Sequence, residues 1–217
     1  MLQRSIGVRF LLISIALVVS SCSLAEANGR ETADAPEQNP IEISMSLYVV
    51  DDASDPPSSP LSSSRTTDEI ASIAERIRSI WLEAGVDLTI RTISRITAPP
   101  DVLERVARGE TSSFVDAAVS GAISVPEPAI INGFYVRQVG SANGETPLGT
   151  RIFFVTDNPS VHDERVSSHE IGHILGLHHT QEDSGRLMYS GTNGMSFSDG
   201  EIDVARYGAA GILDGNR

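Results

Sequence analysis

Residues 169–179 read HEIGHILGLHH, and no other stretch of the 217-residue chain is as informative. On an α-helix, His169 and His173 lie four residues apart, so their imidazoles project from one face on adjacent turns and can meet one metal ion. Glu170 lies about 100° round the helix axis from His169, so it can face a metal-bound water without binding the metal. The pattern therefore predicts two zinc ligands and a general base on a single helix.

A third ligand is predicted just beyond this helix. A straight helix cannot bring a residue at that distance to the same ion, but Gly176 can adopt the positive φ that reverses the chain. His179 then completes three imidazoles and leaves a fourth position for water, as in catalytic zinc sites. His178 is the alternative, but adjacent side chains on an extended segment point to opposite sides, so we expect His178 to face away from the ion.

The eleven-residue stretch resembles the extended motif of the metzincin peptidases, H-E-x-x-H-x-x-G-x-x-H followed by a methionine-containing turn. The segments RLMY (186–189) and FSDGEIDVARYG (197–208) are most similar to matrixins. The resemblance implies a metzincin catalytic domain with a mixed twisted sheet and one active-site helix. It also implies that Met188 lies below the metal, and that an extended peptide substrate lies against an edge strand drawn from residues 129–156.

The sequence departs from the matrixin pattern in several places. It has no cysteine-switch segment, and only His162 and His178 remain outside the motif, too few for a second histidine-rich zinc site. Some metzincins have a tyrosine ligand two residues after the methionine, but here that residue is Ser190, so we give Tyr189 a structural role. One zinc ion is expected. Calcium binding is left open, with no residue pattern that supports it.

The predicted activity is hydrolysis of peptide bonds by a zinc-dependent endopeptidase. Zinc would polarise the scissile carbonyl, and Glu170 would accept a proton from the attacking water. Asp163 precedes the active-site helix and is read as a partner of the helix dipole. A catalytically inactive, zinc-stabilised binding or inhibitory lipoprotein is the alternative, and a zinc hydrolase of non-peptide amides is a third reading. The presence of Glu170 favours an enzyme.

Hydrophobic periodicity predicts the elements around the motif. Four segments rich in alternating apolar or β-forming residues favour strands: 41–50, 86–93, 129–139 and 151–156. Four segments with helical spacing or helix-start residues favour helices: 67–85, 100–107, 161–175 and 198–207. Their order predicts an α+β or α/β sandwich, with Trp81 in the apolar stripe of the first helix. Strand order stays open.

The first 21 residues have the pattern of an export signal, with two arginines followed by the apolar run FLLISIALVV. The run is too short for a permanent membrane-spanning helix. Cys22 ends the tetrapeptide VSSC, which resembles a bacterial lipobox, so we expect a lipid anchor at Cys22. An A-x-A site at residues 25–27 is the alternative and would release a soluble protein. Residues 22–40 are expected to be a flexible tether, and residues 41–217 the catalytic domain.

Charge and cysteine content exclude other classes. The formal net charge is −13, and losing Arg4 and Arg9 with the signal gives −13 − 2 = −15, so nucleic acid is not an expected partner. Cys22 is the only cysteine, so the folded domain has no internal disulfide and no cysteine nucleophile. We expect a protein exported from a bacterial cytoplasm and held in the cell envelope, or else periplasmic or secreted. Its substrates are expected to be proteins or peptides. The sequence does not indicate its oligomeric state.

Overall fold

The computed structural model of the chain describes residues 39–56 and 58–215. The predicted export signal, the lipidation site at Cys22 and nearly all of the predicted tether lie outside the described residues. Within the described ranges, no helix is long and apolar enough to span a membrane. The first strand begins at Ile41, where the sequence predicts the catalytic domain to start.

Strands and helices follow one another along the described chain. Their order is β1 (Ile41–Asp52), α1 (Thr67–Glu83), β2 (Val86–Ala98), α2 (Pro100–Ala107), α3 (Ser112–Val119), β3 (Ile131–Val136), β4 (Gly144–Glu145), β5 (Ile152–Thr156), α4 (Asp163–Ile174) and α5 (Asp199–Leu213). Every predicted strand and helix is present, although β2 and α5 are longer than predicted and β3 is shorter. The sequence analysis missed α3 and β4, which fall in stretches where it predicted neither a helix nor a strand.

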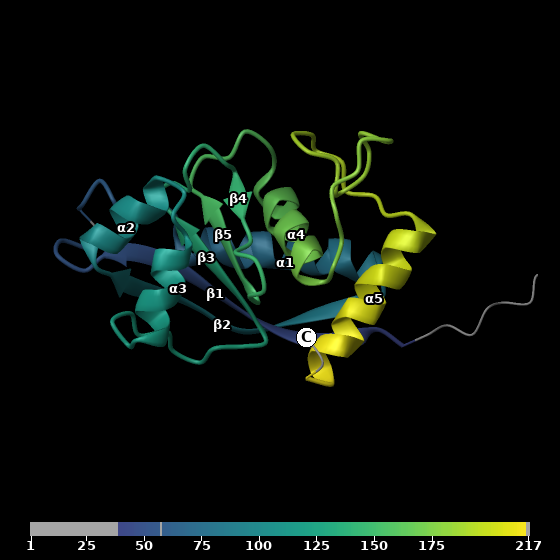
Figure 1. Cartoon of the computed structure of the whole chain (residues 1–217), viewed down its shortest axis with the longest axis horizontal. Coiled ribbons are helices and arrows are strands. Elements are labelled where there is room, and N and C mark those ends of the chain that lie inside the picture. The colour runs from purple at the N-terminus through teal and green to yellow at the C-terminus, as the bar shows by residue number, and fades with distance from the viewer. Residues whose placement is uncertain (1–38, 57, 216–217) are drawn as a thin grey trace, which may run out of the picture. The chain divides into compact units, whose positions relative to one another are not determined.

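The strands form one mixed sheet in the order β2-β1-β3-β5-β4 (Figure 1). β1 pairs in parallel with β2 and β3, and β3 pairs in parallel with β5. β4 is antiparallel to β5 and forms one end of the sheet. Parallel strands need crossover connections. α1 joins the neighbours β1 and β2, and the α2–α3 segment joins β2 to β3, which lies on the other side of β1. The predicted mixed sheet is confirmed.

Helices cover both faces of this sheet, and β1 shows the division. Its residues Ile43, Met45, Leu47 and Val49 belong to the core shared with α1, α4 and α5. The alternate residues Tyr48 and Val50 belong to the core shared with α2 and α3. Figure 1 shows α3 in front of the strands and α1 behind them. β1 is therefore buried on both faces, as expected for a central parallel strand.

Stacked aromatic rings explain why α3 packs where it does. Tyr48, Phe134 and Phe154 occupy matching positions on β1, β3 and β5, with ring centroids 5.1 Å and 5.5 Å apart. Phe114 of α3 packs on this row, 4.8 Å from Phe134, and is fully buried. Such ring pairs add about 0.5–1.5 kcal/mol each beyond the burial of their area. The sequence period of α3 is weak because one large residue makes much of its contact.

Two helices begin with a capping box, in which a hydroxyl and a glutamate satisfy free backbone N–H groups. Thr66 Oγ1 accepts from the N–H of Glu69, and Glu69 Oε2 accepts from the N–H of Thr66 at 2.7 Å. Ser198 and Glu201 form the same pair at the start of α5. The sequence analysis began α1 at residue 67, as the structure does, but it did not identify Thr66 as the N-cap.

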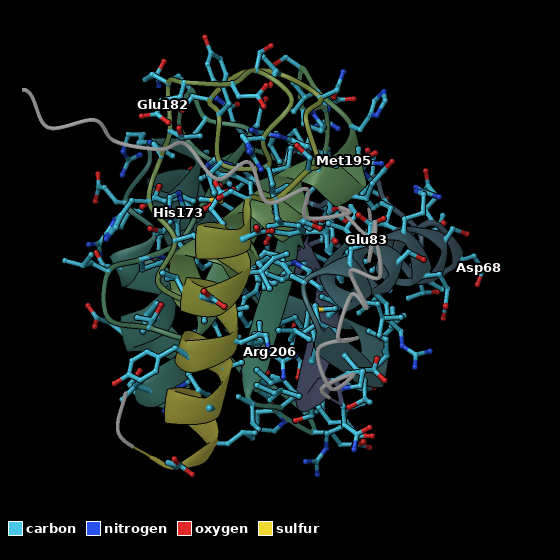
Figure 2. All side chains as sticks on the ribbon, turned by 90° about the vertical axis from the view of Figure 1, so that its right-hand side faces the viewer. Asp68, Glu83, His173, Glu182, Met195 and Arg206 are labelled. Atoms are coloured by element: carbon cyan, nitrogen blue, oxygen red, sulfur yellow. The ribbon has the colours of Figure 1, made fainter. Side chains whose placement is uncertain are left out.

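α5 lies tightly against the end of α4 because Gly208 has no side chain. A Cβ at Gly208 would lie 1.9 Å from the main-chain oxygen of Leu175, a contact that a backbone cannot relieve easily. Arg206, labelled on α5 in Figure 2, donates from Nη1 to the main-chain oxygen of Gly85 at 2.7 Å. The last helix therefore packs directly against the end of α4, inside the histidine motif.

Gly208→Ala should accordingly destabilise the domain. Overpacking of this kind costs about 1–3 kcal/mol, and each kcal/mol lowers the melting temperature of a domain of this size by roughly 2–4 °C. Gly200→Ala on the same helix is the matched control, because nothing lies within 4 Å of its added Cβ. Thermal unfolding by circular dichroism would show the difference, and equal melting temperatures for both variants would contradict this view of the α4–α5 contact.

Candidate metal centre

α4 carries the first two histidines of the motif. It begins at Asp163, two residues later than the sequence predicts, and Asp163 forms a salt bridge with Arg65. The Asp163 carboxylate lies in the first turn of α4, where its negative charge interacts favourably with the positive end of the helix dipole. The sequence analysis gave Asp163 this role. His169 is buried and His173 is half-buried, and their ring centroids are 4.9 Å apart on one side of the helix.

The chain reverses after α4 at the glycine that the sequence analysis selected. Gly176 has φ +95°, in the left-handed region that favours glycine. The N–H of Gly176 bonds to the carbonyl of His173, and that of Leu177 to the carbonyl of Gly172, so the last carbonyls of the helix are satisfied. The reversal carries His179 back to the helix, with its Nε2 3.0 Å from His169 Nε2 and 3.1 Å from His173 Nε2.

The other ring nitrogens of the two helical histidines are held by backbone carbonyls. His169 Nδ1 lies 2.8 Å from the main-chain oxygen of Leu187, and His173 Nδ1 lies 3.0 Å from that of Leu177. A carbonyl can only accept, so Nδ1 carries the proton in both rings and Nε2 presents a lone pair. Burial lowers the pKa of His169 to about 3 and also lowers that of His173, so both imidazoles stay neutral.

This donor set fits a zinc ion. Three imidazole nitrogens lie within 4.8 Å of one another, and two of them are lone-pair donors aimed at the same space. Ligands of a tetrahedral zinc, each about 2.0–2.1 Å from the ion, are roughly 3.3 Å apart, close to the separations of His179 from its neighbours. Hydrogen bonds from ligand Nδ1 atoms to carbonyls are the usual outer support of such sites. The residues present therefore suit one zinc ion.

Met188 packs directly under the helix that carries the histidines. It is fully buried, and a Cβ on Gly172 would lie 2.6 Å from its sulfur. The preceding residue, Leu187, supplies the carbonyl that holds His169. The segment after the histidine motif thus forms a floor for the site, in the place that the resemblance to metzincins implies for Met188.

Glu170 lies beside the histidines, almost fully buried and supported by the end strand of the sheet. Thr146, just after β4, places its hydroxyl 3.0 Å from both Glu170 Oε2 and the main-chain oxygen of Glu170. Gly144 makes this approach possible, because a Cβ there would lie 2.7 Å from Val166 Cγ1 and 3.0 Å from Glu170 Cγ. β4 and α4 are therefore in contact at the residue predicted to be the general base.

Burial raises the pKa of Glu170 to about 7, while the hydrogen bond from Thr146 and the charge of Arg165 oppose that shift. A bound cation would also oppose the rise in this pKa, since a nearby opposite charge favours the ionised carboxylate. A carboxyl group held near neutrality suits transfer of protons in both directions. The site therefore has a candidate base as well as candidate ligands.

Sequence reasoning missed Arg165, which is buried one turn before His169 on α4. Its Nη2 donates to the main-chain oxygen of Leu187 at 2.9 Å and to that of Tyr189. Leu187 O therefore accepts from both Arg165 and His169. The i, i+4 spacing from Arg165 to His169 was a usable signal, because such residues share one helix face. Thr146 lies outside every predicted helix and strand and gave no such signal.

The two adjacent histidines, His178 and His179, lie in different surroundings. Both side chains are exposed, but His179 joins the group with His169 and His173, whereas His178 lines a different cavity. The side chain of His162 lies before α4, 4.0 Å from Glu164. Among the described residues, the three motif histidines form the cluster with metal-ligand spacing.

Comparison with known proteins identifies the fold. No protein-family model and no curated protein sequence matches this chain. Archaemetzincin from Methanopyrus kandleri is similar in structure, with a TM-score of 0.54 at 14% identity over 78% of this chain and 96% of that one. A chain of a chaperone-substrate complex has a TM-score of 0.51 at 14% identity, over 82% of this chain and 36% of that one. Metalloproteinase-II from Bacteroides fragilis has a TM-score of 0.48 at 13% identity, over 80% of this chain and 55% of that one.

The similarity to archaemetzincin covers nearly all of that protein. At this identity it shows the fold alone, and the predicted metzincin-like fold with a mixed sheet is confirmed. The narrower likeness to matrixins rests on the quoted sequence segments.

Proposed function

We propose that this chain is a zinc-dependent endopeptidase that cleaves extended protein or peptide substrates. The observation that carries the proposal is the convergence of the Nε2 atoms of His169, His173 and His179 beside the buried carboxyl group of Glu170. Three histidines leave a fourth position on zinc for water, the arrangement of catalytic rather than structural sites. The matrixin-like Met188 turn and the fold of archaemetzincin support the same reading.

The residues around the site have separable roles in this reaction. When bound, zinc supplies the Lewis acidity that polarises a carbonyl and lowers the pKa of water. Glu170 accepts a proton from the attacking water and later delivers it to the nitrogen of the leaving amine. Thr146 holds the Glu170 carboxylate by its hydroxyl, and the Leu187 and Leu177 carbonyls keep His169 and His173 oriented. The outer edge of β4, the end strand, is the candidate site for the substrate backbone.

Two other functions would use the same ligands. A binding or inhibitory lipoprotein that keeps zinc but has lost turnover would not need a carboxyl group in the pocket of the histidines, and Glu170 both lines that pocket and is supported by Thr146. A hydrolase of non-peptide amides needs the same chemistry on a small substrate. The free strand edge favours a peptide, because it offers backbone hydrogen bonds that a small amide cannot use fully.

Incubating the purified protein with a diverse peptide library, with and without a chelator, tests the proposal. We expect one equivalent of zinc per chain, cleavage inside peptides, loss of cleavage on chelation and recovery when zinc is returned. A protein that holds zinc but cleaves nothing would instead support the inactive binding function. Cleavage that is unaffected by complete removal of metal would refute the proposed chemistry.

We also propose that the protein is exported from a bacterial cytoplasm and anchored in the cell envelope by a lipid on Cys22, with residues 22–40 as a tether. Cys22→Ser should then abolish incorporation of labelled fatty acid and move the protein to the soluble fraction. Intact-mass analysis of the native protein gives an independent reading. An unmodified N-terminus at Asn28 would instead show cleavage after residues 25–27 and release in soluble form.

A further inference from the structure

A cavity of about 790 Å³ opens beside the candidate metal centre. Two residues connect it to that centre: His173, a proposed ligand, and Thr146, which contacts Glu170; both line the cavity and also the pocket that holds the three histidines. A substrate whose scissile bond lies at the metal therefore has the cavity within reach of its neighbouring side chains. Its volume is in the range of sites that bury small ligands or large side chains.

The chemistry of the cavity wall is mostly apolar. Ile174 from the end of α4, Leu177 after the reversal and Ile212 from the last turn of α5 form its apolar part, and each is at least nine-tenths buried. Arg151, just before β5, carries positive charge, and none of the lining residues is acidic. In a chain with a net charge of −13, this wall favours an apolar side chain and disfavours a lysine or an arginine.

The direction of β4 decides which part of a substrate reaches the cavity. β4 runs from the metal pocket, lined by Ala142 and Asn143, toward Thr146 and the cavity. An extended peptide added to its outer edge is more stable in the antiparallel direction. Such a peptide runs from the cavity toward Ala142, so residues on the N-terminal side of the scissile bond lie over the cavity.

We propose that this cavity, formed by the β4–β5 loop, the end of α4 and the last turn of α5, binds a large apolar side chain N-terminal to the scissile bond. This inference rests on the proposed peptidase function and names its substrate class: peptides with phenylalanine or leucine shortly before the cleaved bond. Burial of such a side chain in place of alanine should raise kcat/KM by roughly 10- to 100-fold. Arginine at the same position should be cleaved no faster than alanine.

Peptides that differ only in the three residues before the cleaved bond test this selectivity. Ile212→Trp should fill the cavity and remove the preference for phenylalanine over alanine, a loss of roughly tenfold or more. Leu213→Trp is the matched control, since the neighbouring Leu213 is half-exposed and does not line the cavity. Thr150→Trp should fill the cavity from the β4–β5 loop without entering the core. It therefore replaces Ile212→Trp in this test if Ile212→Trp fails to fold.

A binding measurement keeps this inference separate from the proposed activity. Fluorescence anisotropy with the zinc-loaded Glu170→Ala protein reports the affinity of labelled phenylalanine and alanine peptides even if nothing is ever cleaved. We expect the phenylalanine peptide to bind more tightly to Glu170→Ala, and the difference to vanish when Thr150→Trp is added. Equal affinities, a preference for arginine, selectivity only on the C-terminal side of the bond, or a preference that survives both tryptophan substitutions would overturn the proposal.

Discussion

Glu170→Ala should abolish peptide cleavage and leave zinc binding intact. The side chain of Glu170 is not one of the three converging imidazoles, so its removal takes no ligand away. It does remove the group that accepts and returns the proton, and general acid–base catalysis contributes about 10²- to 10⁴-fold to rate. Turnover of one good peptide, measured beside zinc content by atomic absorption, would show the two effects separately.

Glu170→Gln is the conservative control for this variant. It keeps the shape and can still accept the hydrogen bond of Thr146, so it should fold and bind zinc like the parent while losing cleavage to a similar extent. Thr146→Val tests the support alone and should reduce turnover far less than either change at Glu170. Equal turnover by Glu170→Ala and the parent would remove Glu170 from its proposed role.

The candidate site could be predicted as far as its geometry is local. The spacing of His169 and His173 follows from one helical turn, and Gly176 shows where the chain reverses, so the positions of three histidines and Glu170 follow from eleven residues. The supporting contacts are of another kind. Thr146 lies 24 residues before Glu170 and reaches it only because the sheet places β4 against α4. The carbonyls of Leu187 and Leu177 are backbone groups that every residue has, so the sequence does not indicate which of them would bond to the histidines.

The fold shows the same division between local and distant information. Long elements with a clear period, such as α1 and β1, were predicted almost to the residue. β4 has only two residues, too few for any period, and it is a strand because Gly144 and Glu145 pair with β5. The strand order depends on which hydrophobic faces meet, and residues far apart in the sequence make those contacts. The rings of Tyr48, Phe134 and Phe154, in register on β1, β3 and β5, span more than 100 residues of sequence.

Arg165 joins the support of the metal site to the fold. Its guanidinium group holds Leu187 O and Tyr189 O, and Leu187 O in turn orients His169. Arg165 of α4 thus holds the turn that contains Met188, and this turn in turn supports α4. Gly172 has no side chain, which lets Met188 pack against α4. These contacts make the site part of the main core, so the imidazoles can be held in place before a metal arrives.

The choice between the two adjacent histidines leads to the second large effect. His179→Ala should lose most of its zinc and nearly all of its activity. Two imidazoles and extra waters bind zinc less tightly than three imidazoles, and they hold the attacking water in poorer geometry. Loss of a mere hydrogen-bonding partner of a ligand already costs about 10- to 100-fold in affinity, so loss of the ligand itself should cost more.

His178→Ala is the matched control, because it removes an imidazole from the neighbouring position of the same segment. The side chain of His178 lines the cavity beside the site, whereas the Nε2 of His179 lies 3.0 Å from His169 Nε2 and 3.1 Å from His173 Nε2. Zinc content should therefore stay near one per chain in His178→Ala, with cleavage retained. Since both variants lose the same side chain, a difference between them reports position rather than general damage. Zinc retained by His179→Ala but lost from His178→Ala would reverse the ligand assignment.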